Sequence, residues 1–466
     1  MLIGRFGRCG ASCVVDAAQQ YYRDVRAEGA HERRVTWPMV IVAAAGAVLI
    51  IAWCIWVVPI DHPVYGLFNM GVDNHVYRGG AEAVWNGTPL YDGPVYKVWQ
   101  FTYPPFAALI LVPLAWTGLH GAQVLWNIGN VVCLLAVVAM SLRALHFRFD
   151  RRFVAFVIGF SIAVVGLEPV HTTLWNGQIN LLLAVLVIGD LARRSGRWTG
   201  IGTGLAAGIK LTPIFYAAHL ITTRRWRAAI TLIITFAATI AIGIAVLGSQ
   251  GVEFWTVRLT ETGRIGPLTH PANQSLNGFF ARLGPMGLGN PPNWLWIPTG
   301  VLVGCLGLWA AWSAHRVGRD LLAISITGMT SAAVSPFSWG HHWVWVVPLL
   351  LIALVEAVDA VDRTRVRTWV WALAPIAVVA STFTWWRRST VTSRDGVEHL
   401  RLRFGIFRFI RSPQGPGWEI ALRLAGSGAY VLLLLATIAV TLWWTRRVEP
   451  IRFKPTVSES ASAHSD

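Results

Sequence analysis

Residues 38–59 read PMVIVAAAGAVLIIAWCIWVVP, and no charged side chain interrupts them. A helix needs about 20 mainly apolar residues to cross the hydrocarbon core of a bilayer, so this stretch can span a membrane once. A polar segment that contains Arg23, Arg26, Arg33 and Arg34 precedes it, which predicts a retained first span rather than a cleaved signal peptide. The stretch therefore predicts an integral membrane protein.

Similar apolar runs recur along the whole chain. The later runs that qualify, or nearly qualify, are residues 121–142, 153–168, 178–192, 227–247, 293–314, 319–336, 342–360, 368–384 and 424–445. Of all 466 residues, 55% are hydrophobic and 13% are charged, whereas an ordinary globular domain has about 25% charged residues. This composition excludes a soluble enzyme, a disordered protein, a collagen-like chain and a disulfide scaffold.

The basic residues follow the pattern of a membrane protein rather than that of a nucleic-acid-binding protein. The formal net charge is +16, but Lys supplies only 3 of the 39 basic residues. They occur in short clusters between apolar runs, as cytoplasmic loop anchors do. The clusters span residues 143–152, 193–197, 224–227, 316–319, 363–367 and 446–454. We expect them to be cytoplasmic, together with the tails 1–37 and 446–466, and we expect no nucleic-acid partner.

Charge also decides two stretches of ambiguous length, 103–117 and 199–222. If residues 103–117 crossed the membrane, the cluster 143–152 would move outside, so we expect a re-entrant or surface-lying helix there. Residues 199–222 have Arg on both flanks, which predicts two short helices with a break at residues 210–213. The prediction is about twelve helical segments within 38–445, with outer segments 60–120, 169–177, 248–292 and 385–423.

Two polar motifs lie at the predicted outer boundary. Asp73 follows the first span within GVDNHVYR (71–78). Partial desolvation would suit it to act as a general base, although a solvated loop carboxylate fits the same position. His341 and His342 lie among Trp residues in SPFSWGHHW (335–343), which suits a phosphate or sugar site and equally an interfacial aromatic belt.

Other polar residues lie in or beside apolar runs. Lys210 is about ten residues from either end of its run, so a snorkelling anchor is awkward and a functional role is expected. Glu168, Gln178 and Asn180 bring a carboxylate and amides to an outer boundary, and amides suit sugar hydroxyls as well as helix caps. The triplet 273–275 formally matches a glycosylation sequon.

The last outer segment is unusually basic. Its arginines are Arg387, Arg388, Arg394, Arg401, Arg403, Arg408, Arg411 and Arg423. Long translocated loops tolerate such charge, but arginines interleaved with Phe404, Phe407 and Phe409 also suit a surface that lies on anionic lipid headgroups. We expect lipid contact here.

Six stretches together carry a family resemblance. They are VDNHVYRGG (72–80), FTYPPFAALILVPL (101–114), LEPVHTTLWNGQINLLL (167–183), AAGIKLTP (206–213), NQSLNGFFARL (273–283) and SPFSWGHHWVWVVPL (335–349). In this order and at these intervals they resemble the actinobacterial polyprenol-phosphate-mannose-dependent α-1,2-mannosyltransferases. These are glycosyltransferases of the GT-C fold that build phosphatidylinositol mannosides and lipomannan. The resemblance covers about residues 55–360 and leaves the N-terminal tail and 385–423 unmatched.

The resemblance implies an all-α polytopic membrane protein, with a catalytic domain over 38–445 and an active site at the periplasmic mouth. It implies that Asp73 is the catalytic base and that Lys210, His341 and His342 hold the donor phosphate and the acceptor. Further positions that it marks for donor or acceptor binding are Arg78, Tyr103, Glu168, Gln178, Asn180, Asn273 and Gln274. The implied partners are membrane lipids, a polyprenyl-phosphate-mannose donor and a phosphatidylinositol mannoside or lipomannan acceptor.

The chemistry of such a transfer needs few groups. In a single inverting displacement only the acceptor hydroxyl loses a proton, so one carboxylate suffices, unlike the pair in a glycosidase. The leaving phosphate has a second pKa of about 6 and departs without a general acid. We therefore expect neither a metal nor a cofactor. A transporter or flippase of a lipid-linked saccharide, and a non-catalytic scaffold of envelope biosynthesis, remain as alternatives.

Overall fold

The computed structural model describes residues 32–448, apart from 58–59, 61, 63, 193–195, 362–368, 393–397 and 409–416. Most of both predicted tails, and Arg394 and Arg411, thus lie outside the described residues. Within them, four helices are individually long and apolar enough to cross a membrane, and six if each of two bent pairs counts as one span. The chain is a helical membrane protein, and the full count of about twelve segments remains a prediction.

The helices follow the apolar runs closely. The long apolar helices are α2 (Trp37–Trp56), α5 (Leu119–Ala144), α11 (Trp226–Leu247) and α14 (Trp296–Arg316). Shorter ones are α6 (Arg151–Ala163), α15 (Asp320–Val334), α16 (Val346–Val361), α17 (Trp369–Thr382) and α19 (Ala429–Thr445). The predicted runs are confirmed to within a few residues at most ends, because apolar length is the constraint that both reflect.

Helix α2 shows why the chain needs a lipid surrounding. Ile41, Val42, Val48 and Leu49 are each between 64% and 70% exposed, a continuous apolar surface that water would not tolerate. The inner side of α2 packs on α6 through small residues. A Cβ added at Gly159 would lie 3.2 Å from the backbone of Ala43, which is the close approach that small residues allow between membrane helices.

Three stretches of the bundle are broken. Residues 103–117 form α4 (Pro105–Ile110) and the 3-10 helix η1 (Val112–Trp116), each too short to span. Residues 199–222 form α9 (Ile201–Ile209), η3 (Thr212–Phe215) and α10 (Tyr216–Thr222), so the predicted break at 210–213 is confirmed. The run expected over 178–192 is helix α8 (Asn180–Leu191), and the expected outer segment 169–177 lies in helix α7 (Glu168–Asn176) and the turn after it. The two helices are bent by 119° where they meet.

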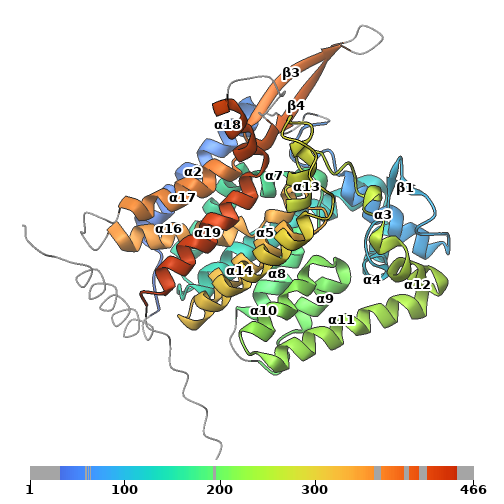
Figure 1. Ribbon diagram of the computed structural model, residues 1–466, viewed down its shortest axis with the longest axis horizontal. Coiled ribbons are helices and arrows are strands. Elements are labelled where there is room, and N and C mark those ends of the chain that lie inside the picture. The colour runs from blue at the N-terminus through green and yellow to red at the C-terminus, as the bar shows by residue number, and fades with distance from the viewer. Residues whose placement is uncertain are drawn as a thin grey trace, which may run out of the picture.

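The predicted outer segments contain more structure than expected. Segment 60–120 holds α3 (Val72–Trp85) and the small hairpin β1 (Pro94–Tyr96) and β2 (Trp99–Gln100). Segment 248–292 holds α12 (Ser249–Thr256), η4 (Arg258–Thr260), η5 (Thr262–Arg264) and α13 (Leu276–Leu283). Figure 1 shows α3, α4, β1 and α12 gathered at one end of the molecule. These short helices and the hairpin pack on one another, and this packing explains why the two segments are structured.

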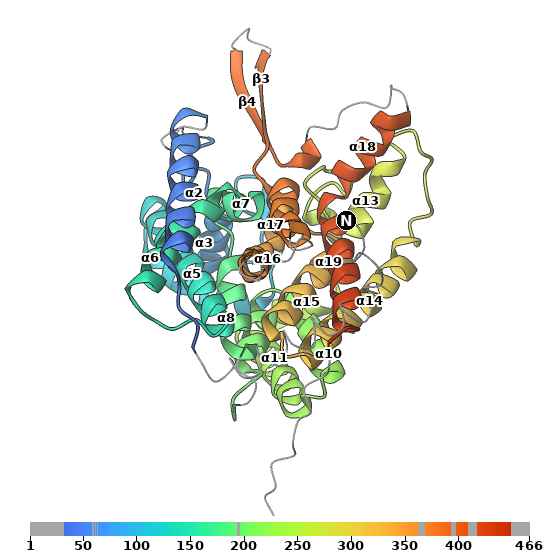
Figure 2. The same ribbon diagram turned by 90° about the vertical axis from the view of Figure 1, so that its left-hand side faces the viewer.

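The described residues of segment 385–423 form a hairpin and the start of a helix. Strands β3 (Trp386–Thr392) and β4 (Glu398–Phe404) pair antiparallel, followed by η7 (Ile406–Arg408) and α18 (Gly417–Ser427). The hairpin projects from the helical body in both views (Figures 1 and 2). Its base is held by Leu402 and Phe404, which pack against Trp53, Tyr65 and Trp175.

Candidate active site

Asp73 lies in the first turn of α3, not in a solvated loop. The helix starts after Gly71, whose φ of 52° is a left-handed conformation that favours glycine. The Gly71 N–H donates to the carbonyl of Trp175 at 3.0 Å, and this bond ties the start of α3 to α7. Local backbone geometry therefore fixes where the carboxylate stands.

The surroundings of Asp73 suit a general base. Burial raises the pKa of this carboxyl to about 6, while a hydrogen bond from Gln178 and the charge of Lys210 act in the opposite direction. A base works best when its pKa lies near the working pH. Asp73 is thus ionised at neutral pH and still able to take up a proton.

The break between α7 and α8 places two amides beside Asp73. Gly177 ends α7 with a φ of 70°, and a Cβ there would come within 2.9 Å of the Asn74 side chain. The turn that follows carries Gln178, whose Oε1 accepts hydrogen bonds from Tyr77 at 3.2 Å and from Asn180 at 3.3 Å. Both amide side chains are buried, so these hydrogen bonds are largely shielded from bulk water.

Lys210 caps the broken helix α9 in an extended conformation. Its Nζ donates to Asn180 Oδ1 at 3.0 Å and lies 3.0 Å from His342 Nε2. It also lies over the Tyr103 ring, 5.5 Å from the centroid. Both hydrogen-bond partners are uncharged, so they do not neutralise the ammonium, and its positive charge can stabilise a bound anion.

The two histidines occupy the 3-10 turn η6 (Gly340–Trp343), between α15 and α16. Their ring centroids are 5.0 Å apart. Burial, followed by the charge of Lys210, holds the pKa of both imidazoles well below its ordinary value. Both rings are therefore neutral at physiological pH and can donate or accept one hydrogen bond at each nitrogen.

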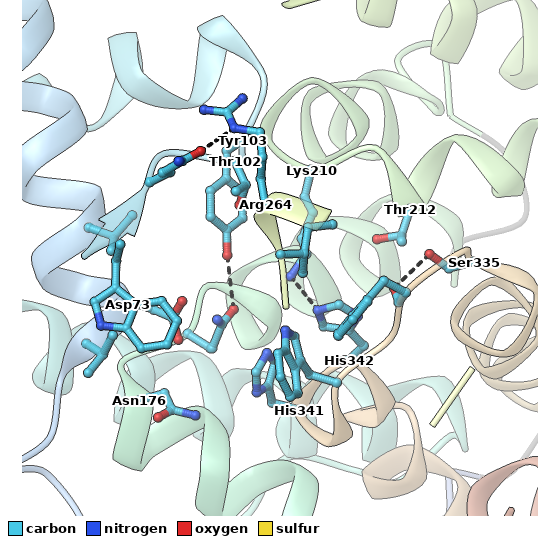
Figure 3. Close-up of a pocket in the computed structure, with 18 of the residues that line it drawn as sticks. Asp73, Thr102, Tyr103, Asn176, Lys210, Thr212, Arg264, Ser335, His341 and His342 are labelled. Carbon is cyan, nitrogen blue, oxygen red and sulfur yellow. Dashed lines mark hydrogen bonds between the residues drawn. The ribbon is translucent and has the colours of Figure 1, made fainter. Parts of the chain in front are cut away.

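These groups line one cavity of about 460 Å³. Figure 3 shows Asp73 on one side of it and Lys210 with His342 on the other. Of the residues marked by the sequence, those that line the cavity are Asp73, Tyr103, Glu168, Gln178, Lys210, His341 and His342. Asn180 lies directly behind them and bonds to Lys210.

The structure places three other marked residues outside the cavity lining. Arg78 pairs with Glu82 at 2.7 Å and donates to the Thr117 carbonyl at 2.8 Å. The Asn273 Oδ1 accepts from the Ser338 N–H at 3.0 Å, and the Gln274 N–H donates to the Ser338 carbonyl at 2.6 Å. Polar atoms of Arg78, Asn273 and Gln274 thus bond to the protein itself, and their substrate-binding role stays a prediction. The Asn273 side chain and the Gln274 backbone N–H anchor the turn that carries the histidines. The side-chain amide of Gln274 instead donates to the Ser427 carbonyl at 3.0 Å.

Two residues of the site were missed by sequence reasoning. Tyr77 lies four positions after Asp73, and residues four apart share one helix face, so a helical assignment of 72–85 would have found it. Arg264 also lines the cavity. Its guanidinium donates hydrogen bonds to the Gln100 side chain and, at 3.1 Å, to the Tyr91 carbonyl. Nothing in its local sequence distinguishes Arg264 from other loop arginines.

Apolar helices around a cavity lined by the carboxylates of Asp73 and Glu168, by the Lys210 ammonium and by two imidazoles are the features of a membrane-embedded enzyme. Comparison with known proteins specifies the class of enzyme. The chain belongs to glycosyltransferase family 87, whose model matches residues 101–336. No solved structure matches the chain.

Curated relatives agree with this family. A polyprenol-phosphate-mannose-dependent alpha-(1-2)-phosphatidylinositol mannoside mannosyltransferase of Mycobacterium tuberculosis is 32% identical, over 69% of this chain and 76% of its own length. A polyprenol-phosphate-mannose-dependent alpha-(1-2)-phosphatidylinositol pentamannoside mannosyltransferase of Mycolicibacterium smegmatis is 34% identical, over 64% of this chain and 73% of its own length. The resemblance seen in the six sequence motifs is thereby confirmed. The family favours an enzyme over the transporter and the scaffold.

Proposed function

We propose that this chain transfers mannose from polyprenyl-phosphate-mannose to a hydroxyl of a phosphatidylinositol mannoside or of lipomannan, forming an α-1,2 linkage at the periplasmic face. The names of the relatives support the donor, the linkage and the phosphatidylinositol mannoside acceptor. Lipomannan enters as the related acceptor that the sequence resemblance implies.

The observation that carries the proposal is the position of Asp73 across the cavity from Lys210 and His342 (Figure 3). In the reaction the acceptor hydroxyl attacks the anomeric carbon of the donor mannose, and Asp73 takes the proton of that hydroxyl. The bond from the anomeric carbon to the phosphate oxygen breaks with its electron pair on the phosphate. A β-linked donor then gives an α-linked product, because one displacement inverts the configuration.

The charge that builds up on the leaving phosphate meets Lys210 and the two histidines. A fixed cation and fixed donors stabilise such charge in a site shielded from water without having to reorganise. A phosphate monoester has a second pKa of about 6 and needs no proton from the protein to leave. The proposed reaction therefore uses one carboxylate, and neither a metal nor a cofactor.

The side of the membrane is part of the proposal. The basic cluster 143–152 follows α5, and the residues before α5 are those of the cavity end of the molecule. Basic clusters favour the cytoplasm, so both termini would be cytoplasmic and the cavity would open to the periplasm. A lipid-linked donor and a lipid acceptor would both reach it from the outer leaflet.

The test is a reconstituted transfer reaction. Purified protein is given polyprenyl-phosphate-mannose with a phosphatidylinositol mannoside in one arm and lipomannan in the other, and the product is identified by linkage analysis. We expect a new α-1,2-linked mannose in at least one arm, and its absence with the Asp73→Asn protein purified in the same way. A different linkage, or equal product from both proteins, would contradict the proposal.

A further inference from the structure

The polar groups between Asp73 and His342 form one chain of hydrogen bonds whose direction is set at Lys210. The Lys210 Nζ lies 3.0 Å from Asn180 Oδ1 and 3.0 Å from His342 Nε2. A charged ammonium has three donors and no acceptor. Both neighbouring atoms must therefore accept, and this fixes the orientation of each side chain.

On one side of Lys210, the donor-to-acceptor direction of the hydrogen bonds continues through the amides of Asn180 and Gln178 to the Asp73 carboxylate. Because Asn180 Oδ1 accepts from Lys210, its NH2 group faces Gln178 and donates to Gln178 Oε1 at 3.3 Å. The hydroxyls of Tyr77 and Tyr103 donate to the same oxygen at 3.2 Å and 3.4 Å. Gln178 is thus left with its NH2 group for Asp73, and that group hydrogen-bonds the carboxylate. Asp73 must in turn act as an acceptor.

On the other side the direction passes through the imidazole. If Nε2 of His342 accepts from Lys210, the ring proton of this neutral histidine sits on Nδ1. That nitrogen is buried and has no hydrogen-bond partner among the residues that the structure describes. A buried donor without a partner is costly. His342 lines the cavity, so a small shift of its ring on ligand binding would bring the Nδ1–H to an acceptor there.

We propose that Lys210 sets the hydrogen-bond polarity of the whole site: through Asn180 and Gln178 it holds Asp73 ready to accept a proton, and through His342 it presents a donor to the leaving phosphate. Asn180 and Gln178 are then positioning residues, which act through Asp73 and Lys210. The inference rests on the proposed function, because it assumes that Asp73 is the base. A reversed Gln178 amide would turn its carbonyl toward Asp73, and this would favour the protonated carboxyl, which cannot serve as a base.

The test of the first branch is the pH dependence of kcat/KM in Asn180→Leu and Asn180→Asp. The titratable groups that interact with Asp73 are Lys210, Tyr77 and Tyr103, and both variants leave them in place. We expect the acidic limb of the profile to move to higher pH by about one unit. At a fixed pH below the limb, kcat/KM should then fall about tenfold. Tyr77→Phe, a milder neutral change that removes one donor to Gln178, should move the limb in the same direction by less.

Asn86→Asp is the matched control. Asn86 is exposed at the C-terminal cap of α3, outside the cavity lining, so the same chemical change there should leave the limb in place. An unchanged limb in both Asn180→Leu and Tyr77→Phe would overturn the inference, even if Asn180→Asp shifted it, because the shift would then come from the added charge alone. If Asp73→Asn keeps its turnover, the proposed function fails instead.

The second branch has a readout that does not need activity. Nitrogen-15 NMR of labelled histidine distinguishes the two neutral tautomers, and the signal of His342 is identified by its loss in His342→Gln. We expect the Nδ1–H tautomer in the wild-type protein and a mixture in Lys210→Met, where the ring has lost its donor. A wild-type ring with its proton on Nε2 would overturn this branch.

Discussion

The Tyr430 hydroxyl donates a hydrogen bond of 2.5 Å to Glu168 Oε2, although 262 positions separate the two residues. The same carboxylate packs against the turn η6, since a Cβ added at Gly340 would lie 2.2 Å from Oε2. Glu168 therefore fastens α7, η6 and α19 together at the edge of the cavity. We interpret Glu168 as a residue that shapes the site, and Asp73 as the carboxylate that reacts.

Replacing each carboxylate by its amide should separate these roles. Asp73→Asn keeps the shape but cannot accept the proton, so we expect kcat to fall by about 100-fold or more, the usual weight of general-base catalysis. Glu168→Gln should lose much less, because an amide oxygen still accepts from Tyr430. Steady-state kinetics of the purified variants measures both, with Glu82→Gln on the outer part of α3 as the control. A larger loss in Glu168→Gln than in Asp73→Asn would reverse the assignment.

The pH dependence follows from the burial of Asp73. Its pKa is raised to about 6, and only the ionised form can take the proton, so kcat/KM should rise as the pH rises through about 6 and then level off. An unburied aspartate, with a pKa of about 3.9, would give no change in this range. A profile that is flat between about pH 5 and pH 7 would argue against a buried aspartate base.

Lys210 should bind phosphate in the donor and in the product alike. Lys210→Met keeps much of the side-chain length and removes the charge. A hydrogen bond to a charged group contributes about 1.5 to 3 kcal/mol, so we expect about 10- to 100-fold weaker binding of both polyprenyl-phosphate-mannose and free polyprenyl phosphate. Equilibrium binding measures this, and Lys97→Met, at an exposed loop position, serves as the control. Unchanged affinity would make Lys210 a purely structural residue.

The sidedness of the cavity can be read with a single cysteine. A Cβ added at Gly118, just before α5, meets nothing within 4 Å, so Gly118→Cys in a cysteine-free background should not disturb the fold. We expect it to react with a membrane-impermeant thiol reagent applied from the periplasm. Arg148→Cys, at an exposed position beyond the other end of α5, should react only after permeabilisation. The reverse pattern would invert the topology.

The arginines of the β3–β4 hairpin should favour an anionic acceptor. Arg387 lies directly opposite Arg403 in the strand register, and Ser389 lies opposite Arg401. A basic surface of this kind attracts anionic lipid headgroups. Neutralising Arg401, Arg403 and Arg408 to Gln should raise KM for a phosphoinositide acceptor more than for a neutral mannoside, and added salt should shrink the difference.

The matched control for the hairpin is the same triple change to Lys, which keeps the charge. We expect its KM for the phosphoinositide acceptor to stay near the wild-type value. Equal effects of the Gln variant on both acceptors, at low and at high salt, would show that these arginines are only a solvated surface.

Much of the bundle could be predicted because apolar length and charge parity act on whole segments. The first span, predicted over 38–59, is α2 (Trp37–Trp56), and the break near Lys210 appears where an ionisable residue and Pro213 interrupt an apolar run. The fold of 385–423 could not be predicted in this way. Its hairpin depends on Leu402 and Phe404 reaching Trp53 and Trp175, and contacts at such separations leave no local pattern.

Contacts between residues far apart in the sequence also limited what could be predicted of the site. Asp73, Lys210 and the histidine pair stood out because charged and polar residues are unusual beside apolar runs. The sequence did not show that the Asn273 side chain bonds to the backbone of Ser338 and the Gln274 side chain to that of Ser427, because an amide that binds a substrate and one that holds a turn look alike in a sequence. Nor did it show that Gln178 joins Asp73 to Lys210, since hydrogen-bond direction exists only in three dimensions.

The left-handed turn at Gly177 bears on how this enzyme can change. One residue there sets the bend between two half-helices and also the distance to α3, so any larger side chain would move the base and its amide partners together. The outward faces of α2 and α11, by contrast, expose apolar side chains, and substitutions among apolar residues there should be tolerated. Directed evolution of acceptor preference should therefore find its tolerated changes on the cavity rim and the hairpin, while position 177 returns glycine in every survivor.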